Sequence, residues 1–206
     1  MSSASTPHLA SQTIGGFLES LSAMAPTPGG GAAAGLTGAT AAATAGMVVS
    51  YSIDKKSLSE HRPFNVDAQN QLTRARAMFL TLGDEDATGY GVLNALWKLD
   101  KDDPVRVAGW DDAVRGAIGP PRAMVALSVE VLRLCEQLIP TTNRQLRSDL
   151  GVAAVLAQAS ARSAAWNVKI NIPLLPADEQ DSAHKEVDAL LKAGESLCTA
   201  IEAGCA

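Results

Sequence analysis

Aromatic residues and cysteines are scarce in this sequence, and their scarcity excludes several kinds of protein. Aromatic residues make up 4% of the 206 residues, so the core must be built from aliphatic and small side chains. The three cysteines are odd in number and lack paired spacing, which favours a reducing compartment over a disulfide framework. The three histidines are scattered, and no His or Cys pair has the spacing of metal ligands, so no metal site is predicted.

Basic residues are also too few to suggest a polyanionic partner. The chain has 17 Lys and Arg against 22 Asp and Glu, a formal charge of −5. Nucleic acids and anionic membranes attract concentrated Lys and Arg, so neither is predicted as the main partner. The segment Met1–Gln12 has no basic region followed by an apolar run, as a secretory signal would have. A cytoplasmic location is therefore expected.

One long segment lacks charge altogether. From Ser20 to Ile53 there is no charged residue or histidine, and after Gly31 the segment is rich in Ala, Gly and Thr. Membrane insertion is driven by Leu, Ile, Phe and Val, which are few here. The segment therefore predicts a long, buried central helix whose small residues let neighbouring helices approach closely. Such a face could equally meet a second copy of the chain.

The rest of the sequence follows helical spacing. Apolar residues recur three and four positions apart before Pro26 and again over 72–82, 90–97, 124–138, 146–161 and 187–201. Gly83 is expected to kink or end a helix, and Pro120–Pro121 to end another. Residues 168–172 alternate as in a strand, but a single strand would lack a partner, so helix is the prediction there.

These patterns predict an all-α, single-domain helical bundle with a long Ala/Gly-rich central helix. No composition shift or long linker marks a boundary, so residues 1–206 are interpreted as one domain. Its core is expected over about 14–204, with residues 1–12 flexible.

The most specific local motif is a proline- and glycine-rich turn before the central helix. Pro28, Gly29, Gly30 and Gly31 would let a ligand come close to the backbone, and free N–H groups at a helix start favour an anion or a polar ring edge. The motif lacks the Gly-Lys-Ser/Thr of a phosphate loop and the strand that a dinucleotide fingerprint requires. A tight crossover with no ligand is an equally weighted alternative.

Two charged groups follow, each with a structural alternative. Lys55 and Lys56 come where the central helix ends, and a solvated, dipole-favoured helix end would explain them. Asp84, Glu85 and Asp86 crowd three carboxylates, which could raise one pKa toward a value useful for acid/base chemistry. Acidic residues at a helix start would also fit simple capping.

Polar residues flank a later helix as well. Asn143, Ser148 and Asp149 precede it and could simply cap it, while Asn167 and Asn171 lie four residues apart near its far end. That spacing places the two amides on one helical face in an otherwise apolar segment, where unpaired amides would be costly. They either hydrogen-bond a neighbour or hold a ligand.

Together these segments resemble a known family. The matching motifs are APTPGGGAAA at Ala25–Ala34, the lysine pair, DEDATGY at Asp84–Tyr90, LWKLDKDDP at Leu96–Pro104, and NRQLRSDLGVAA with NVKIN between Asn143 and Asn171. They occur in the order found in the cyclodeaminase part of formiminotransferase-cyclodeaminase and in the stand-alone methenyltetrahydrofolate cyclohydrolases, over roughly residues 14–200.

The resemblance implies an all-helical homodimer that binds a tetrahydrofolate derivative and needs no metal or other cofactor. By motif position it implies Asp86 as the acid/base group and Lys56 as a residue that tunes Asp86 or binds a carboxylate. It further implies Asn143 and Asp149 as hydrogen-bonding partners of the pterin. The following residues complete the expected substrate-binding set: Pro28, Gly29, Gly30, Gly31, Lys55, Tyr90, Ser148, Asn167 and Asn171.

Three functions remain open at this point. Hydrolysis of 5,10-methenyltetrahydrofolate to 10-formyltetrahydrofolate is favoured, because no formiminotransferase domain accompanies the sequence to supply formimino-folate. The alternative enzyme is a formiminotetrahydrofolate cyclodeaminase, which releases ammonia. The third is a non-catalytic, folate-binding helical dimer. Departures from the family motifs at Asp54, Thr37, Gly38 and residues 57–64 affect the choice of reaction rather than the fold.

Overall fold

The described part of the chain, residues 8–206 of a computed structural model, is helical without any strand. The prediction of an all-α fold is therefore confirmed. The part of the predicted flexible segment at residues 1–7 lies outside the described residues. The α-helices are α1 (Ile14–Ser22), α2 (Gly30–Ile53), α3 (Arg62–Trp97), α4 (Pro104–Thr141), α5 (Arg147–Asn171) and α6 (Ala177–Cys205). Short 3-10 helices are η1 (Leu9–Ser11), η2 (Lys56–His61), η3 (Arg144–Leu146) and η4 (Ile172–Leu174).

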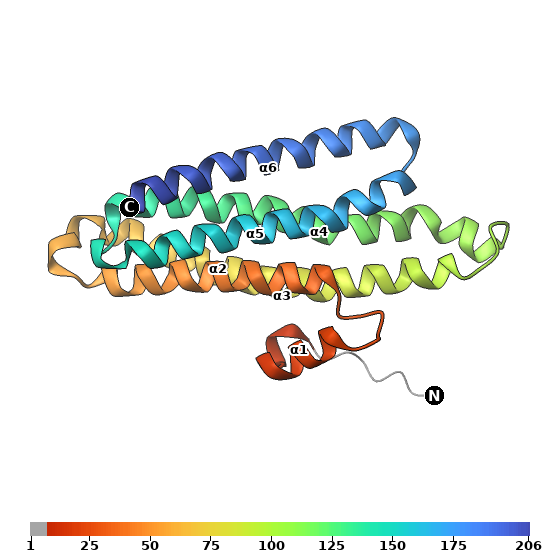
Figure 1. Cartoon of the computed structure of the whole chain (residues 1–206), viewed down its shortest axis with the longest axis horizontal. Coiled ribbons are helices and arrows are strands. Elements are labelled where there is room, and N and C mark those ends of the chain that lie inside the picture. Colours follow the sequence, from red (N-terminus) through yellow and green to blue (C-terminus); the bar gives the residue numbers. More distant parts are fainter. Residues whose placement is uncertain (1–7) are drawn as a thin grey trace.

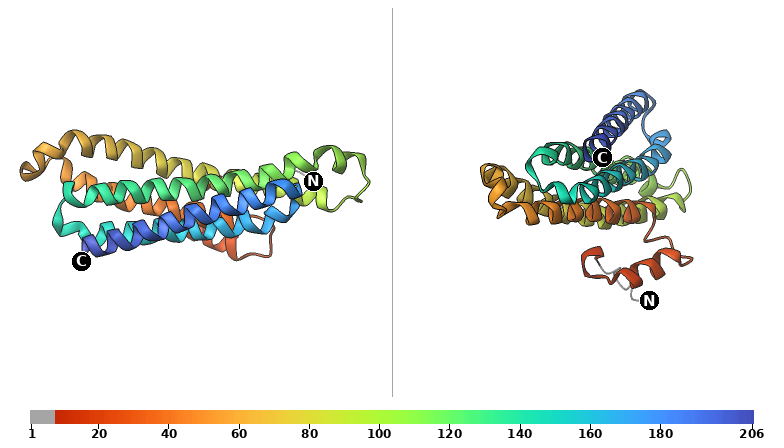
Figure 2. Two further views of the ribbon diagram at one scale, coloured as in Figure 1. Left: turned by 90° about the horizontal axis from the view of Figure 1, so that it is seen from above. Right: turned by 60° about the vertical axis from the view of Figure 1, so that its left-hand side comes forward.

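Four long helices form the body of the molecule. Figure 1 shows α2 to α5 running alternately in opposite directions, with α6 lying along α4 and α5 and α1 below the bundle. The two views of Figure 2 show the same arrangement, with α1 outside the bundle. Apolar side chains from all five long helices fill the centre, where Leu72, Phe79, Leu132, Leu150 and Ile201 are fully buried. The short connections favour antiparallel neighbours, which is why the chain alternates direction.

The central helix α2 is as long as predicted and packs between α3 and α5. Its small residues allow this packing: a methyl group at Gly35 would lie 2.7 Å from the backbone oxygen of Phe79, and one at Gly38 would lie 2.5 Å from the Phe79 ring. The helix is long and apolar enough to cross a membrane, but 61% of its most apolar window is buried inside the bundle. Its lack of charge is thus explained by contact with other helices.

Helix ends follow the local sequence. Thr13 caps α1 by accepting a hydrogen bond from the Gly16 N–H at 3.1 Å. Asp103 caps α4 by accepting a hydrogen bond from the Val105 N–H at 2.8 Å, with Pro104 in the first turn of the helix. Residues 168–171 belong to α5, so the choice of helix over strand in this segment is confirmed.

Two predicted helix breaks are wrong. Helix α3 continues through Gly83, which also places Asp84, Glu85 and Asp86 inside a helix and rules out the capping interpretation of these acids. Helix α4 continues through Pro120 and Pro121. Proline disfavours a helix interior because it lacks an N–H, yet both halves of α4 are buried against neighbouring helices, and this packing outweighs the local preference.

Candidate active site

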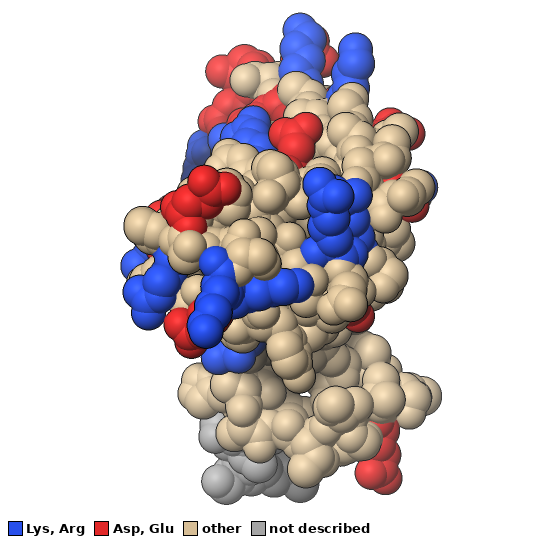
Figure 3. Space-filling view, turned by 90° about the vertical axis from the view of Figure 1, so that its left-hand side faces the viewer, with Lys and Arg blue, Asp and Glu red and all other residues tan. Residues whose placement is uncertain are grey.

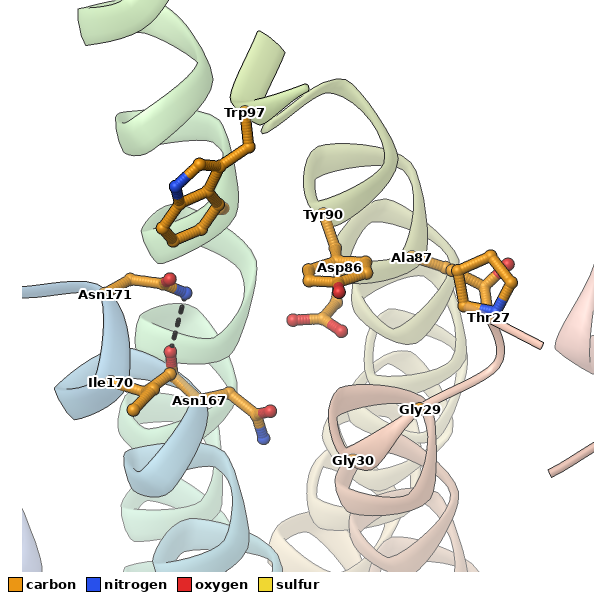
Figure 4. A pocket seen from close by; sticks show the side chains of 12 residues that line it. Thr27, Gly29, Gly30, Asp86, Ala87, Tyr90, Trp97, Asn167, Ile170 and Asn171 are labelled. Carbon is orange, nitrogen blue, oxygen red and sulfur yellow. Dashed lines mark hydrogen bonds between the residues drawn. The ribbon is translucent and has the colours of Figure 1, made fainter. Parts of the chain in front are cut away.

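A pocket opens where the start of α2 meets α3 and the end of α5. It encloses about 270 Å³ and is closed on one side by the turn before α2. Figure 4 shows the side chains of Asp86 and Asn167 pointing into the same space from α3 and α5. Six of the residues predicted from the sequence line it, namely Gly29, Gly30, Asp86, Tyr90, Asn167 and Asn171.

The start of α2 forms the floor of the pocket. Gly29 is the N-cap and offers no side-chain cap, so the first N–H groups of the helix have no partner within it. A methyl group at Gly30 would lie 3.2 Å from Oδ1 of Asn167, so glycine here lets the asparagine lie directly over the helix start. The helix dipole and these N–H groups favour an electronegative ligand atom.

Asp86 lies against the second residue of the same helix. A methyl group at Gly31 would fall 2.0 Å from Oδ2 of Asp86, so only glycine leaves room for the carboxyl group. Among the described residues, none forms a hydrogen bond or an ion pair with the Asp86 side chain. Burial raises the pKa of Asp86 to about 6, because the charged form is poorly solvated there. This carboxyl group can therefore exchange a proton near neutral pH.

The two asparagines of α5 present hydrogen-bond acceptors to the pocket. Nδ2 of Asn167 donates to the Ser163 carbonyl at 3.1 Å, and Nδ2 of Asn171 donates to the Asn167 carbonyl at 3.0 Å. Within residues 8–206 no donor meets either Oδ1 atom. The amide groups are thus held in place by their own helix, and their oxygens remain available to a ligand.

Sequence reasoning found one residue of the apolar wall of the pocket, Tyr90, and missed two others, Trp97 and Ile170. All three side chains line the pocket and are exposed at its mouth. Trp97 is held edge-to-face against Trp110, with 5.9 Å between the ring centroids. A signal was available, because Asp86, Tyr90 and Trp97 are spaced four and seven apart and therefore share one face of a helix.

The other predicted residues lie at the opposite end of α2. Nζ of Lys55 donates to Oδ1 of Asn143 at 2.6 Å, and the Asn143 N–H donates to Oγ of Ser52 at 3.0 Å. The 24 residues of α2 span about 36 Å, so one chain does not bring this cluster to the pocket. Figure 3 looks at this end, where Lys and Arg side chains are exposed. Lys56, Ser148 and Asp149 also belong to this end, whereas Pro28 is buried beside the pocket.

The pocket combines features suited to a planar, polar ring. It offers aromatic walls, free backbone N–H groups, amide oxygens and one carboxyl group that titrates near neutrality. None of the described residues that line it is Lys or Arg, and no group of three potential metal ligands occurs within residues 8–206. The arrangement can bind a heteroaromatic ring and move a proton at a position beside Asp86.

Comparisons with known proteins agree on one family. Residues 13–189 match the model of the formiminotransferase-cyclodeaminase family. A methenyltetrahydrofolate cyclohydrolase from Methylorubrum extorquens is 33% identical over 196 residues, which cover 90% of this chain and 92% of that protein. The crystal structure of a formiminotetrahydrofolate cyclodeaminase from Thermotoga maritima superposes with a TM-score of 0.87 at 21% identity, covering 95% of this chain and 96% of the other.

Proposed function

Because the chain belongs to the formiminotransferase-cyclodeaminase family, we propose that it is a methenyltetrahydrofolate cyclohydrolase. The relative with that name shares 33% identity over most of both chains, which supports this reaction over the alternatives. The cyclodeaminase of known structure is 21% identical, a level that supports the shared fold alone. The observation that carries the proposal is Asp86, a carboxyl group with a raised pKa and no side-chain partner among the described residues, at the edge of a ring-sized pocket.

The proposed reaction has two steps at the one-carbon bridge. Water adds to the cationic methenyl carbon and gives a proton to the Asp86 carboxylate, leaving a neutral tetrahedral adduct. The bond from this carbon to N5 then breaks, N5 takes the proton from Asp86, and the adduct hydroxyl releases its own proton to solvent. The products are 10-formyltetrahydrofolate and one net proton. Ionised Asp86 also favours the cationic substrate electrostatically.

The remaining pocket residues orient the substrate in this proposal. The pterin ring stacks against Tyr90 and Trp97, and its amide and amino groups bond to the free N–H groups of α2 and the oxygens of Asn167 and Asn171. Gly29, Gly30 and Gly31 keep the floor low enough for the ring to approach Asp86. The folate substrate is then the only small molecule that the reaction needs besides water.

The proposal extends to assembly and location. A homodimer is supported by exposed apolar side chains on α2 and α5, among them Tyr51, Val152 and Trp166, which a second copy would cover. A cytoplasmic enzyme is supported by the burial of α2, the one described helix apolar enough to cross a membrane.

Loss of methenyltetrahydrofolate absorbance tests the reaction. Purified protein should accelerate hydrolysis over the uncatalysed rate, and Asp86→Asn should reduce kcat by about 10² to 10⁴, the usual contribution of acid/base catalysis. Glu85→Gln is the matched control, because Glu85 is an exposed neighbour outside the pocket and should retain full activity. An Asp86→Asn variant with unchanged turnover would remove the proposed mechanism.

Formimino-folate distinguishes the two enzymes. Ammonia release from formiminotetrahydrofolate, without methenyl hydrolysis above background, would identify a cyclodeaminase, in which N10 attacks the formimino carbon and ammonia leaves. Binding of both folates with neither reaction would identify a non-catalytic binding protein. Hydrolysis without ammonia release is the expected result.

A further inference from the structure

The α2–α5 pair carries functional residues at both ends and an uncovered face between them. At one end is the pocket with Asp86, and at the other is the cluster of Lys55, Lys56 and Asn143, about 36 Å away along α2. A folate carries carboxylate groups on its glutamate tail, yet no Lys or Arg is among the described residues that line the pocket. The pocket and the available cations are therefore separated within one chain.

The face between the two ends is apolar and follows a regular spacing. Exposed residues of α5 recur three or four positions apart, and Trp166 and Ile170 among them are 77% and 74% exposed. The outer stripe of α2 has the same spacing, from Ala33 to Tyr51. Figure 1 shows these two helices side by side, with α6 on the other side of α5. The stripes consist of Ala33, Thr37, Thr40, Thr44, Met47 and Tyr51 on α2, and Val152, Val155, Ala159, Arg162, Trp166 and Ile170 on α5.

The threonine side chains on this face are less polar than their hydroxyl groups suggest. The hydroxyl groups of Thr37, Thr40 and Thr44 each donate to the carbonyl four residues earlier in α2, at 2.8 Å. Their donors are thus satisfied within the helix, and the face can be dehydrated at low cost. Arg162 is the one charged residue in the two stripes.

Charge and area identify the occupant of this face as a second copy in antiparallel orientation. The pocket end carries Asp84, Glu85 and Asp86, while the far end carries exposed Lys55 and Lys56. A twofold axis across the helices places opposite charges together, whereas a parallel pair would place like charges together. Two helices about 10 Å wide and about 36 Å long give roughly 700 Å² per copy, close to the roughly 800 Å² of a stable interface.

This pairing joins the two ends of the face. Helix α2 is centred near residue 41, beside Thr40, so a twofold axis there places Gly30 and Gly31 of one copy opposite residues 52 and 51 of the other. Asp86 lies against Gly31, and Lys55 and Lys56 follow residue 52 by about one helical turn. We propose that each active site is composite: Lys56 of the second copy, next to its Lys55–Asn143 pair, binds the substrate carboxylate in the pocket that contains Asp86.

This inference rests on the proposed function for its substrate, and paired variants test it. Asp86→Asn removes the pocket carboxylate, and the double change Lys55→Glu with Lys56→Glu reverses the basic end. Each homodimer should lose at least about tenfold in kcat/KM, the second mainly through a higher KM, because charge-assisted contacts bind the substrate. Heterodimers of the two variants are obtained by co-expression with two different affinity tags and sequential purification.

The heterodimer gives opposite results for the two arrangements. In a composite site, one of its two sites combines an intact Asp86 with intact lysines, so kcat/KM should recover to about half of the wild-type value. If each site lies within a single chain, both sites remain damaged and the heterodimer only averages the two homodimers, which would overturn the proposal. If wild-type protein does not hydrolyse the substrate, equilibrium dialysis measures methenyltetrahydrofolate binding instead. A composite site again predicts that the heterodimer recovers about half of the wild-type binding sites.

A cross-link tests the pairing independently of any reaction. Thr40→Cys should form a disulfide-linked dimer on mild oxidation, because a residue near the twofold axis faces its own copy. Thr73→Cys, on the exposed face of α3, is the control and should form no disulfide-linked dimer under the same conditions. A Thr40→Cys protein that cross-links no better than this control would overturn the antiparallel pairing, whereas an inactive protein that cross-links would contradict the proposed function alone.

Discussion

Two helix contacts in this molecule are built in opposite ways. Where α2 meets α3, glycines replace side chains, so that Gly35 approaches the backbone of Phe79 and Gly31 approaches Asp86. Where α4 meets α6, long side chains bridge the helices through the half-exposed ion pairs Arg115–Glu179 and Arg122–Glu186. The first contact has no room to adjust, whereas the second is flexible and solvated. A carboxyl group that must be held in one place and partly desolvated requires the first kind.

The largest effect is expected where the glycine contact meets the pocket. Gly31→Ala would place a methyl group on the position of the Asp86 carboxyl group, which must then rotate away. Activity in methenyltetrahydrofolate hydrolysis should fall by about 10², the effect of a displacement of roughly 1 Å in a catalytic group. Thermal stability should not fall, because alanine favours a helix over glycine by about 1 kcal/mol. Unchanged kcat/KM in Gly31→Ala would show that Asp86 need not occupy this position.

The next effect concerns packing away from the pocket. Gly35→Ala forces the backbone of α2 away from the Phe79 carbonyl, and such overpacking costs about 1 to 3 kcal/mol in the free energy of unfolding. Gly91→Ala in α3 is the matched control, since its methyl group meets open space and should stabilise the protein by up to about 1 kcal/mol. Urea denaturation of the two variants measures the difference, and equal stabilities would mean that the close contact between α2 and α3 carries no packing constraint.

A smaller effect depends on pH. Burial raises the pKa of Asp86 from 3.8 to about 6, so the folded state binds the proton more tightly than the unfolded state. The stability from this group is complete below pH about 4 and is lost as pH rises through about 6. Asp86→Asn should therefore be more stable than wild type at pH 7 by on the order of 1 kcal/mol, with the difference vanishing near pH 4. Thermal unfolding at both pH values measures it; a variant less stable at pH 7 would contradict the burial cost.

The same ionisation predicts the sign of the activity profile. A general base acts in its ionised form, so kcat/KM for methenyl hydrolysis should rise through pH about 6 and then level off. A profile that falls through this pH instead would assign Asp86 the role of a general acid in the rate-limiting step.

The helices could be predicted from the sequence because their signals are local. Thr13 and Asp103 act as caps and apolar residues follow helical spacing, so the elements and the all-α class follow from neighbouring residues. The breaks predicted at Gly83 and at Pro120–Pro121 failed because burial along the whole helix outweighs a local preference. That burial depends on partners far away in the sequence, which local patterns do not contain.

The site could be predicted only where residues share an element or a motif. Asp86 and Tyr90 were found because one sequence motif contains both, and Asn167 and Asn171 because four-residue spacing places them on one helical face. Trp97 was missed as a pocket residue although it shares the face of Asp86. Asp86 was grouped with Lys56 and Asn143 because their motifs occur in the order found in the family. Motif order gives no distance between residues, and within one chain Asp86 lies at the opposite end of α2 from the other two. Whether a second copy brings them together is a question that sequence order does not address.

The smallest effect is expected at the contact between α4 and α6. Arg122 donates from Nε to Glu186 at 2.8 Å, but both side chains are about half exposed, so solvent weakens their attraction. Arg122→Met keeps the apolar stem over α6 and should cost less than about 1 kcal/mol, and this loss should shrink further in 1 M salt because exposed charges are screened. Urea denaturation at low and high salt measures both values. A loss above about 2 kcal/mol that persists in salt would mean that this ion pair is as constrained as the glycine contact. The α4–α6 contact and the α2–α3 contact would then not differ in flexibility.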